Sequence, residues 1–180
     1  TPARCGCRRC DLVWVWVGDD ALDGPGSVEA PCAALLRATS ERLPVYFMHG
    51  NRDFLVGDRF LQRSGATGLS DPTVLGFGGR RWLLSHGDAL CLDDVDYQRF
   101  RATVRGAAWQ QQFLAQPLLL RRAQARAMRA HSAALQRPAH THADVDGPAA
   151  CAWLQAAGST VLLHGHTHRP ADHALAPGLS

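Results

Sequence analysis

Short apolar runs alternate along this chain with longer stretches in which apolar and small residues recur at helical spacing. The runs that predict strands are residues 12–17, 45–48, 82–85 and 159–163. The stretches that predict helices are residues 30–42, 58–63 and 149–156. Strands that alternate with helices indicate an α/β fold in which helices cover a layered core.

Residues 93–136 break this alternation, because they contain no strand-like run and predict helices that are interrupted near Gly106 and Pro117. Within this segment, polar side chains recur at spacings of 4, 3, 3 and 4 residues, which places them on one face of a helix. They are Arg122, Arg126, Arg129, Ser132 and Gln136. Two interpretations stay open: a solvated helix face, or a helical cap that offers arginines to phosphate and the leucines at 118–120 to lipid.

Three of the predicted strands run directly into polar clusters that contain glycine. The clusters are residues 49–53 (HGNRD), 86–88 (HGD) and 164–168 (HGHTH). Any one of them could be ordinary turn chemistry or a group of surface histidines. Their joint occurrence favours a metal site, because loops at strand ends converge in layered α/β proteins and imidazole is the commonest ligand for transition metals.

Composition narrows the class of protein. A chain of 180 residues with 46% apolar content suits one domain, and it has no apolar run of the roughly 20 residues that a membrane span needs. We therefore expect a soluble, intracellular protein whose six cysteines are free thiols. Paired cysteines and a zinc knuckle at Cys5, Cys7 and Cys10 are alternatives, the second weakened by the lack of a fourth ligand.

All 19 basic residues are arginine, and the net charge is only +3. A charge this small gives no support for nucleic acid as a partner. Arginine nevertheless matters chemically, since its planar fork suits bidentate contact with phosphate.

Taken together, these motifs resemble those of the calcineurin-like metallophosphoesterases. The motifs are residues 49–54, 86–88, 91–94, 97–101 and 164–170, and Asp11 stands at the position of the family's first Gly-Asp motif. In this combination they are most similar to a branch of the family that acts in the lipid A pathway of Gram-negative bacteria. The similarity extends over nearly the whole chain from about Asp11.

The resemblance implies a layered β-sandwich core flanked by helices, in one domain over residues 1–180 with a helical insertion cap over residues 93–137. It implies hydrolysis of the pyrophosphate bond of a UDP-linked diacylated sugar, which yields UMP and the diacylated sugar 1-phosphate. It also implies peripheral association with the cytoplasmic face of the inner membrane, with no nucleic acid as partner.

The same resemblance assigns residue roles. Asp11 would bridge two Mn²⁺ ions, Asn51, His86 and His164 would complete the ligands of one ion, and His166 would bind the other. Its implied substrate contacts are Asn51, Arg52, Asp94, Ser132, Gln136 and His164, with Asn51 and Arg52 at the reacting phosphate.

Arg52 stands at a position where many members of the family have a histidine, which can protonate a leaving group. Arginine stays protonated, so Arg52 favours a leaving group that needs no proton, such as a sugar phosphate.

The chain also departs from the family pattern. It has no Asp-x-His motif, Cys10 rather than glycine precedes Asp11, and Ala139 occupies the place of a lysine. Residues 1–10 look unlike the family, and the chain stops before the expected closing strands, so we expect a fragment. The alternatives are therefore another phosphoesterase of this family or a catalytically impaired fragment, with one metal ion better supported than two.

Overall fold

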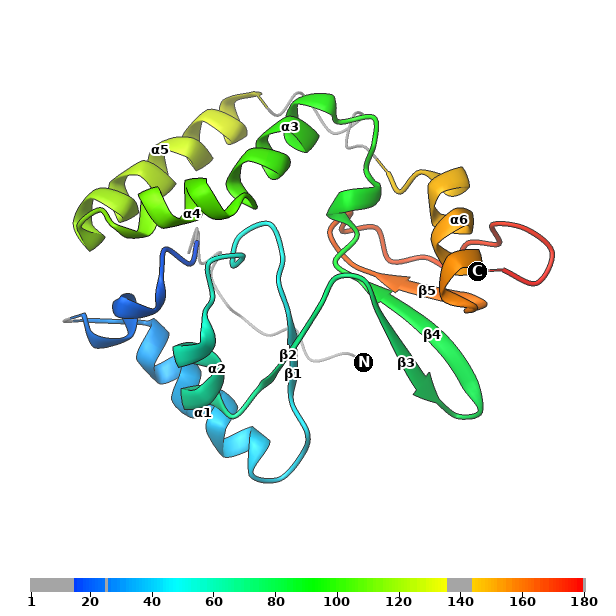
Figure 1. Ribbon diagram of the computed structural model, residues 1–180, viewed down its shortest axis with the longest axis horizontal. Coiled ribbons are helices and arrows are strands. Elements are labelled where there is room, and N and C mark those ends of the chain that lie inside the picture. Colours follow the sequence, from blue (N-terminus) through cyan, green and yellow to red (C-terminus); the bar gives the residue numbers. More distant parts are fainter. Residues whose placement is uncertain (1–14, 25, 136–143, 180) are drawn as a thin grey trace, which may run out of the picture.

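The computed structural model describes residues 15–24, 26–135 and 144–179. Figure 1 shows two small sheets side by side, each with its own helices, and a group of three helices that lies across both. Two short 3₁₀ helices, η1 (Asp19–Asp23) and η2 (Asp88–Leu90), complete the regular structure of these residues.

The first sheet joins β1 (Tyr46–Met48) to β2 (Thr67–Leu69) in parallel. Helices α1 (Glu29–Ser40) and α2 (Asp58–Ser64) pack against each other beside it. The second sheet has the order β3-β4-β5 and comprises β3 (Thr73–Phe77), β4 (Arg80–Ser85) and β5 (Val161–His164). Strands β4 and β5 run parallel, and helix α6 (Gly147–Ala157) leads into β5.

A tight turn joins β3 to β4 as an antiparallel hairpin. Its two central residues, Gly78 and Gly79, have φ values of 60° and 74°. Two-residue hairpin turns that follow the strand twist require positive φ at both positions, which glycine adopts at little cost.

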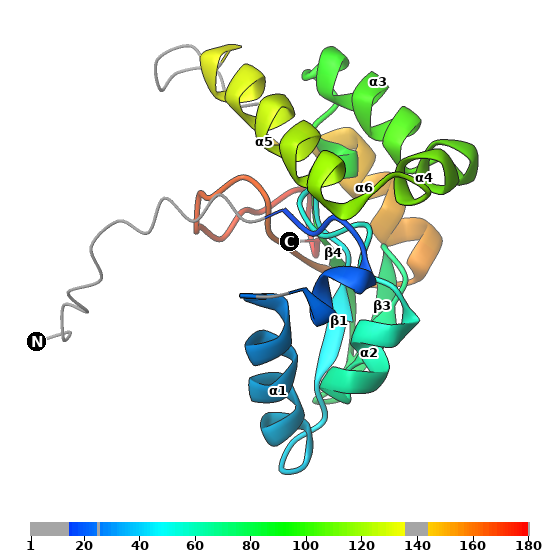
Figure 2. The ribbon, with the colours of Figure 1, turned by 90° about the vertical axis from the view of Figure 1, so that its left-hand side faces the viewer.

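Three helices form the cap: α3 (Val95–Val104), α4 (Ala107–Leu114) and α5 (Leu118–Leu135). Figures 1 and 2 show them lying over the same side of both sheets. The interruptions predicted near Gly106 and Pro117 are confirmed, because α4 begins just after Gly106 and α5 just after Pro117. Phe113 and Ala125 pack into the main apolar core, so the cap is joined to the domain below it.

That core forms around Trp16, whose ring meets Phe60 edge to face with centroids 4.5 Å apart. Asp19 ties the two segments together. Its carboxylate accepts from the Trp16 indole at 3.0 Å, and from the backbone amides of Gly57 at 3.0 Å and Phe60 at 2.9 Å. The last two amides belong to the first turn of α2, whose donors have no partner within the helix.

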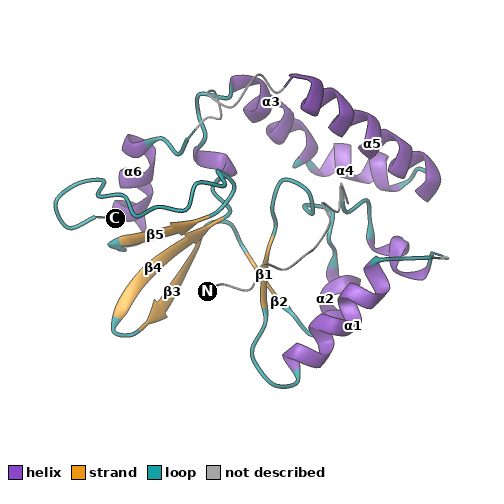
Figure 3. Cartoon of the chain, turned by 180° about the vertical axis from the view of Figure 1, so that it is seen from behind, coloured by secondary structure: helices purple, strands orange, loops and turns teal. Residues whose placement is uncertain are grey.

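Most elements predicted from the apolar pattern are confirmed, as Figure 3 shows. The strand predicted at 12–17 is not: residues 15–17, its described part, form no strand, although the Trp16 amide donates to the Arg52 carbonyl at 2.8 Å. A single hydrogen bond does not make a ladder. Strands β2 and β3 were not predicted, since each is short and contains a glycine, which weakens a strand signal.

No helix in the described part of the chain has the length and apolar character needed to cross a bilayer.

Candidate active site

The second sheet brings two of the predicted clusters to one edge. Strands β4 and β5 are parallel, and Ser85 is paired with His164, so both strands end on the same side of the sheet. Beyond that end, the Gly165 amide donates to the His86 carbonyl at 3.2 Å. Gly87 has φ 99°, and a Cβ there would lie 3.0 Å from the Gly165 carbonyl oxygen. Glycine is therefore required where the two loops meet.

The third cluster arrives from the other sheet, on the loop that follows β1. A Cβ on Gly50 would lie 2.8 Å from Nε2 of His86, so the loop approaches this imidazole more closely than a side chain would allow. The loop is held in shape by a hydrogen bond from the Gly50 amide to the Asp53 carboxylate. Asn51 therefore follows directly on the residue that faces His86.

His166 completes a group of aromatic rings at this edge. Its ring centroid lies 5.1 Å from that of His86 and 5.6 Å from that of Tyr97. Burial, and then the neighbouring charge of His86, lower the pKa of His166 below its usual value. The neutral imidazole, which is the form that binds metals, is favoured as a result.

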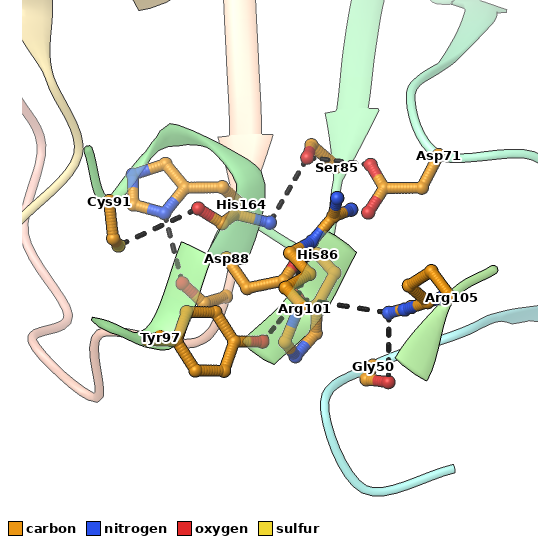
Figure 4. Close-up of polar contacts among 12 residues, drawn as sticks. Gly50, Asp71, Ser85, His86, Asp88, Cys91, Tyr97, Arg101, Arg105 and His164 are labelled. Carbon is orange, nitrogen blue, oxygen red and sulfur yellow. Dashed lines mark hydrogen bonds and ion pairs between the residues drawn. The ribbon is translucent and has the colours of Figure 1, made fainter. Parts of the chain in front are cut away.

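A buried carboxylate lies behind these rings. Asp88 has no exposed surface and stands 3.1 Å from Nδ1 of His86 (Figure 4). Burial alone would raise the pKa of Asp88, but the contact with His86, the hydrogen bond from Tyr97 and the charge of Arg101 hold it well below its usual range. Burial and the hydrogen bond to Asp88 raise the pKa of Tyr97. Asp88 is thus an anion and Tyr97 a neutral donor.

Arg52, on the loop that follows β1, lies close enough to Arg129 of α5 for its charge to act on that side chain. Burial, and then the charge of Arg52, lower the pKa of Arg129. Nη1 of Arg129 is buried and has no hydrogen-bond partner among the described residues. Two guanidinium groups that repel each other, one with an unused donor, form a place suited to an anion.

The predicted site residues are thus brought together only in part. His164 ends β5, and Asn51, His86 and His166 lie on loops that meet at the same edge; Arg52 is on the same loop as Asn51. His164 has its Nδ1 3.1 Å from the Gly165 carbonyl oxygen. Over residues 15–24, 26–135 and 144–179, no three His, Cys, Asp or Glu side chains are grouped closely enough to hold a metal ion.

The metal and substrate roles of all these residues stay predictions. Asp94 caps α3 by accepting from the Tyr97 amide at 3.0 Å, a structural role that neither requires nor excludes contact with substrate. Asp11, Gln136 and the side chain of Ser132 lie outside the described residues, as do Cys5, Cys7 and Cys10.

The residues that surround Asp88 were not predicted from the sequence. The HGD cluster contains Asp88, but Tyr97, Arg101 and Arg105 were not among the predicted site residues. Helical spacing could have indicated the first two, since they lie four residues apart on one face. Arg105 carries no such signal for its contact with the loop at Gly50, because that contact joins residues 55 positions apart.

Comparison with known proteins defines the class. The family model of calcineurin-like phosphoesterases matches residues 6–170, and the chain belongs to this family. The match includes residues 6–10, so the expectation that all of residues 1–10 lie outside the family pattern is wrong for that part.

Three of the relatives that this chain matches share one name. The chain is 50% identical over 165 residues to a UDP-2,3-diacylglucosamine hydrolase of Chromobacterium violaceum, covering 91% of this chain and 68% of that protein. It is 44% identical over 166 residues to the enzyme of that name from Cellvibrio japonicus, covering 92% and 68%. The enzyme of that name from Escherichia coli O7:K1 is 44% identical over 167 residues, again covering 92% and 68%.

Proposed function

We propose that this chain hydrolyses the pyrophosphate bond of UDP-2,3-diacylglucosamine, releasing UMP and 2,3-diacylglucosamine 1-phosphate for lipid A synthesis. The observation that carries the proposal is identity of 44–50% over more than nine-tenths of the chain to hydrolases named for this substrate. The pair Arg52 and Arg129, with one donor unused, supports a substrate that carries several phosphate charges.

We further propose that Asp11, Asn51, His86 and His164 bind one Mn²⁺ ion and that His166, with Asp11, binds a second. The residues present fit such a centre in two respects: Nε2 of His86 faces the loop of Asn51, and burial lowers the pKa of His166, which favours its neutral ring. Imidazole, amide and carboxylate donors are compatible with manganese. Bound metals would lower the pKa of a water nucleophile and neutralise phosphoryl charge.

Arg52 would act on the reacting phosphate by charge rather than by proton transfer. Its guanidinium keeps its proton at working pH, so it can hydrogen-bond phosphoryl oxygens but cannot protonate a leaving alkoxide. A sugar 1-phosphate leaves as an anion and needs no such proton. We propose that Asp94, Ser132 and Gln136 contact the substrate alongside Asn51, Arg52 and His164.

We also propose that the cap, residues 93–137, receives the acyl chains and rests on the cytoplasmic face of the inner membrane. Leu119 and Leu120 near the start of α5 are 79% and 47% exposed. Exposed leucines on a helix rich in arginine, as in α5, are typical of surfaces that contact anionic lipid.

The substrate proposal is tested by comparing turnover of UDP-2,3-diacylglucosamine with that of a simple phosphomonoester, each with Mn²⁺ and with excess chelator. We expect strong preference for the UDP-lipid, complete loss of activity in chelator, and loss in His164→Ala. Elemental analysis of the same preparation counts manganese per chain.

Each outcome of this experiment supports or contradicts one part of the proposal. Preference for the monoester would identify a different phosphoesterase activity of the same family. Two manganese ions per chain support the complete centre, whereas one ion without turnover identifies a chain impaired by the absence of the Asp-x-His motif. Full activity in His164→Ala would contradict the ligand assignment.

A further inference from the structure

The two carboxylate oxygens of Asp88 contact different parts of the molecule. Oδ2 accepts from the Tyr97 hydroxyl at 2.6 Å and from Nε of Arg101 at 3.0 Å, and it lies 3.7 Å from Nη2 of Arg105. All three donors belong to α3 or its C-cap. Oδ1 lies 3.1 Å from Nδ1 of His86, a charge contact rather than an aligned hydrogen bond, and neither atom has a hydrogen-bond partner among the described residues. The cap therefore holds one oxygen and leaves the other for His86.

This contact decides which nitrogen of His86 is available. With Nδ1 against a buried anion, the proton of the neutral ring belongs on Nδ1, and Nε2 keeps its lone pair. Nε2 is the atom that faces Gly50, the residue before Asn51. A carboxylate held close to one ring nitrogen of a histidine favours one tautomer and one orientation of the ring, which strengthens metal binding by the other nitrogen.

Arg105 extends the same arrangement to the loop of Asn51. Its Nη2 donates to the Gly50 carbonyl at 3.0 Å while lying 3.7 Å from Asp88, and its guanidinium sits 5.3 Å from the ring centre of Phe54 (Figure 4 shows the polar contacts). The two loops leave different sheets, and no strand pairing joins those sheets in the described residues. Their relative position therefore depends on contacts of this kind.

We propose that Asp88 is a positioning residue of the metal centre: it orients His86 directly and, through Arg105, sets the distance between the His86 loop and the Asn51 loop. This inference rests on the proposed role of His86 and Asn51 as metal ligands. Helix α3 of the cap is then part of the support of the centre as well as a cover over it.

The test measures Mn²⁺ binding to the metal-free chain by isothermal titration calorimetry, together with urea unfolding in chelator. Asp88→Asn keeps the shape of the side chain and removes its charge. We expect Mn²⁺ affinity to fall by roughly 10- to 100-fold. Glu29→Gln is the matched control, because Glu29 is also a buried carboxylate, 3% exposed, with an arginine at 3.2 Å, but belongs to α1. It should lose stability and keep wild-type Mn²⁺ affinity.

Arg105→Met is the second variant, and it keeps Asp88 paired with Tyr97 and Arg101. It should bind Mn²⁺ several-fold more weakly even if Asp88→Asn does not fold, since the Gly50 carbonyl loses its donor. Wild-type affinity in Arg105→Met, or in a folded Asp88→Asn that is destabilised as Glu29→Gln is, would reduce Asp88 to a structural role.

His86→Ala separates this proposal from the function on which it rests. Weak binding in His86→Ala with wild-type binding in Asp88→Asn and Arg105→Met overturns the positioning role and leaves the metal centre intact. If the wild-type chain itself does not bind Mn²⁺, both proposals fail together.

Discussion

At the scale of a residue, Arg129 supports the proposed phosphate site. Its buried Nη1 has no partner among the described residues, which costs free energy, and the charge of Arg52 adds repulsion. An anion bound between the two guanidinium groups would relieve both costs. Arg122, on the same predicted face, instead pairs with Glu29 at 3.2 Å, so the arginine row divides into a structural end and an unpaired end.

We predict that Arg129→Ala raises KM for the UDP-lipid about tenfold or more, the loss of a charge-assisted hydrogen bond, with a smaller effect on kcat. Because the change removes repulsion and an unpaired donor, it should not lower the free energy of unfolding. Steady-state kinetics and urea unfolding measure the two effects. Arg37→Ala, which removes an exposed arginine of α1 that lies outside this face, is the control. Unchanged KM in Arg129→Ala would exclude the residue from substrate binding.

At the scale of elements, the sequence predicted those with strong periodicity or strong end signals. Helices α1, α2 and α6 and the breaks in the cap follow from apolar spacing and from Gly106 and Pro117. Strands β2 and β3 escaped prediction because a strand of three to five residues with a glycine has too few side chains to show alternation. Their existence depends on pairing with β1 and β4 rather than on local preference.

Helix α5 carries a prediction about the membrane. Replacing Leu119 and Leu120 with serine should weaken association with phosphatidylethanolamine and phosphatidylglycerol vesicles by roughly tenfold or more, since two exposed apolar side chains are lost. Leu118 is kept because it packs against the core. Phe77→Ser, at an exposed position of 72% in the β3–β4 hairpin, is the control. Vesicle co-sedimentation measures the effect, and unchanged binding of the double variant would count against a membrane-facing cap.

At the scale of the whole molecule, polar contacts of Arg121 join the cap to the segment at Val17 and Asp20 below it. Arg121 of α5 is 2% exposed; it donates to the Val17 carbonyl and to the Gln116 carbonyl at 2.9 Å, and pairs with Asp20. The contacts of Arg121 with Val17 and Asp20 span 104 and 101 positions of sequence, and periodicity alone cannot indicate them.

We predict that Arg121→Met lowers the free energy of unfolding by about 2–4 kcal/mol, because buried carbonyl oxygens lose their donor. Arg99→Met should change it by less than about 0.5 kcal/mol, since Arg99 and its partner Asp96 are 78% and 96% exposed. Urea unfolding followed by circular dichroism compares the two. Equal stability of both variants would show that Arg121 does not hold the cap to the core.

By itself the sequence determined the family and the order of most elements, and it predicted which clusters carry chemistry, because apolar period, turn residues and ligand types are local properties. It indicated that residues 49–53, 86–88 and 164–168 belong to one site, through the rule that loops at strand ends converge. Only the tertiary structure decided how they meet: Gly50 against His86, Gly87 against the Gly165 carbonyl, and Asp88 between His86 and α3. Those contacts join segments from two sheets and a cap, and their geometry depends on packing over long distances in sequence.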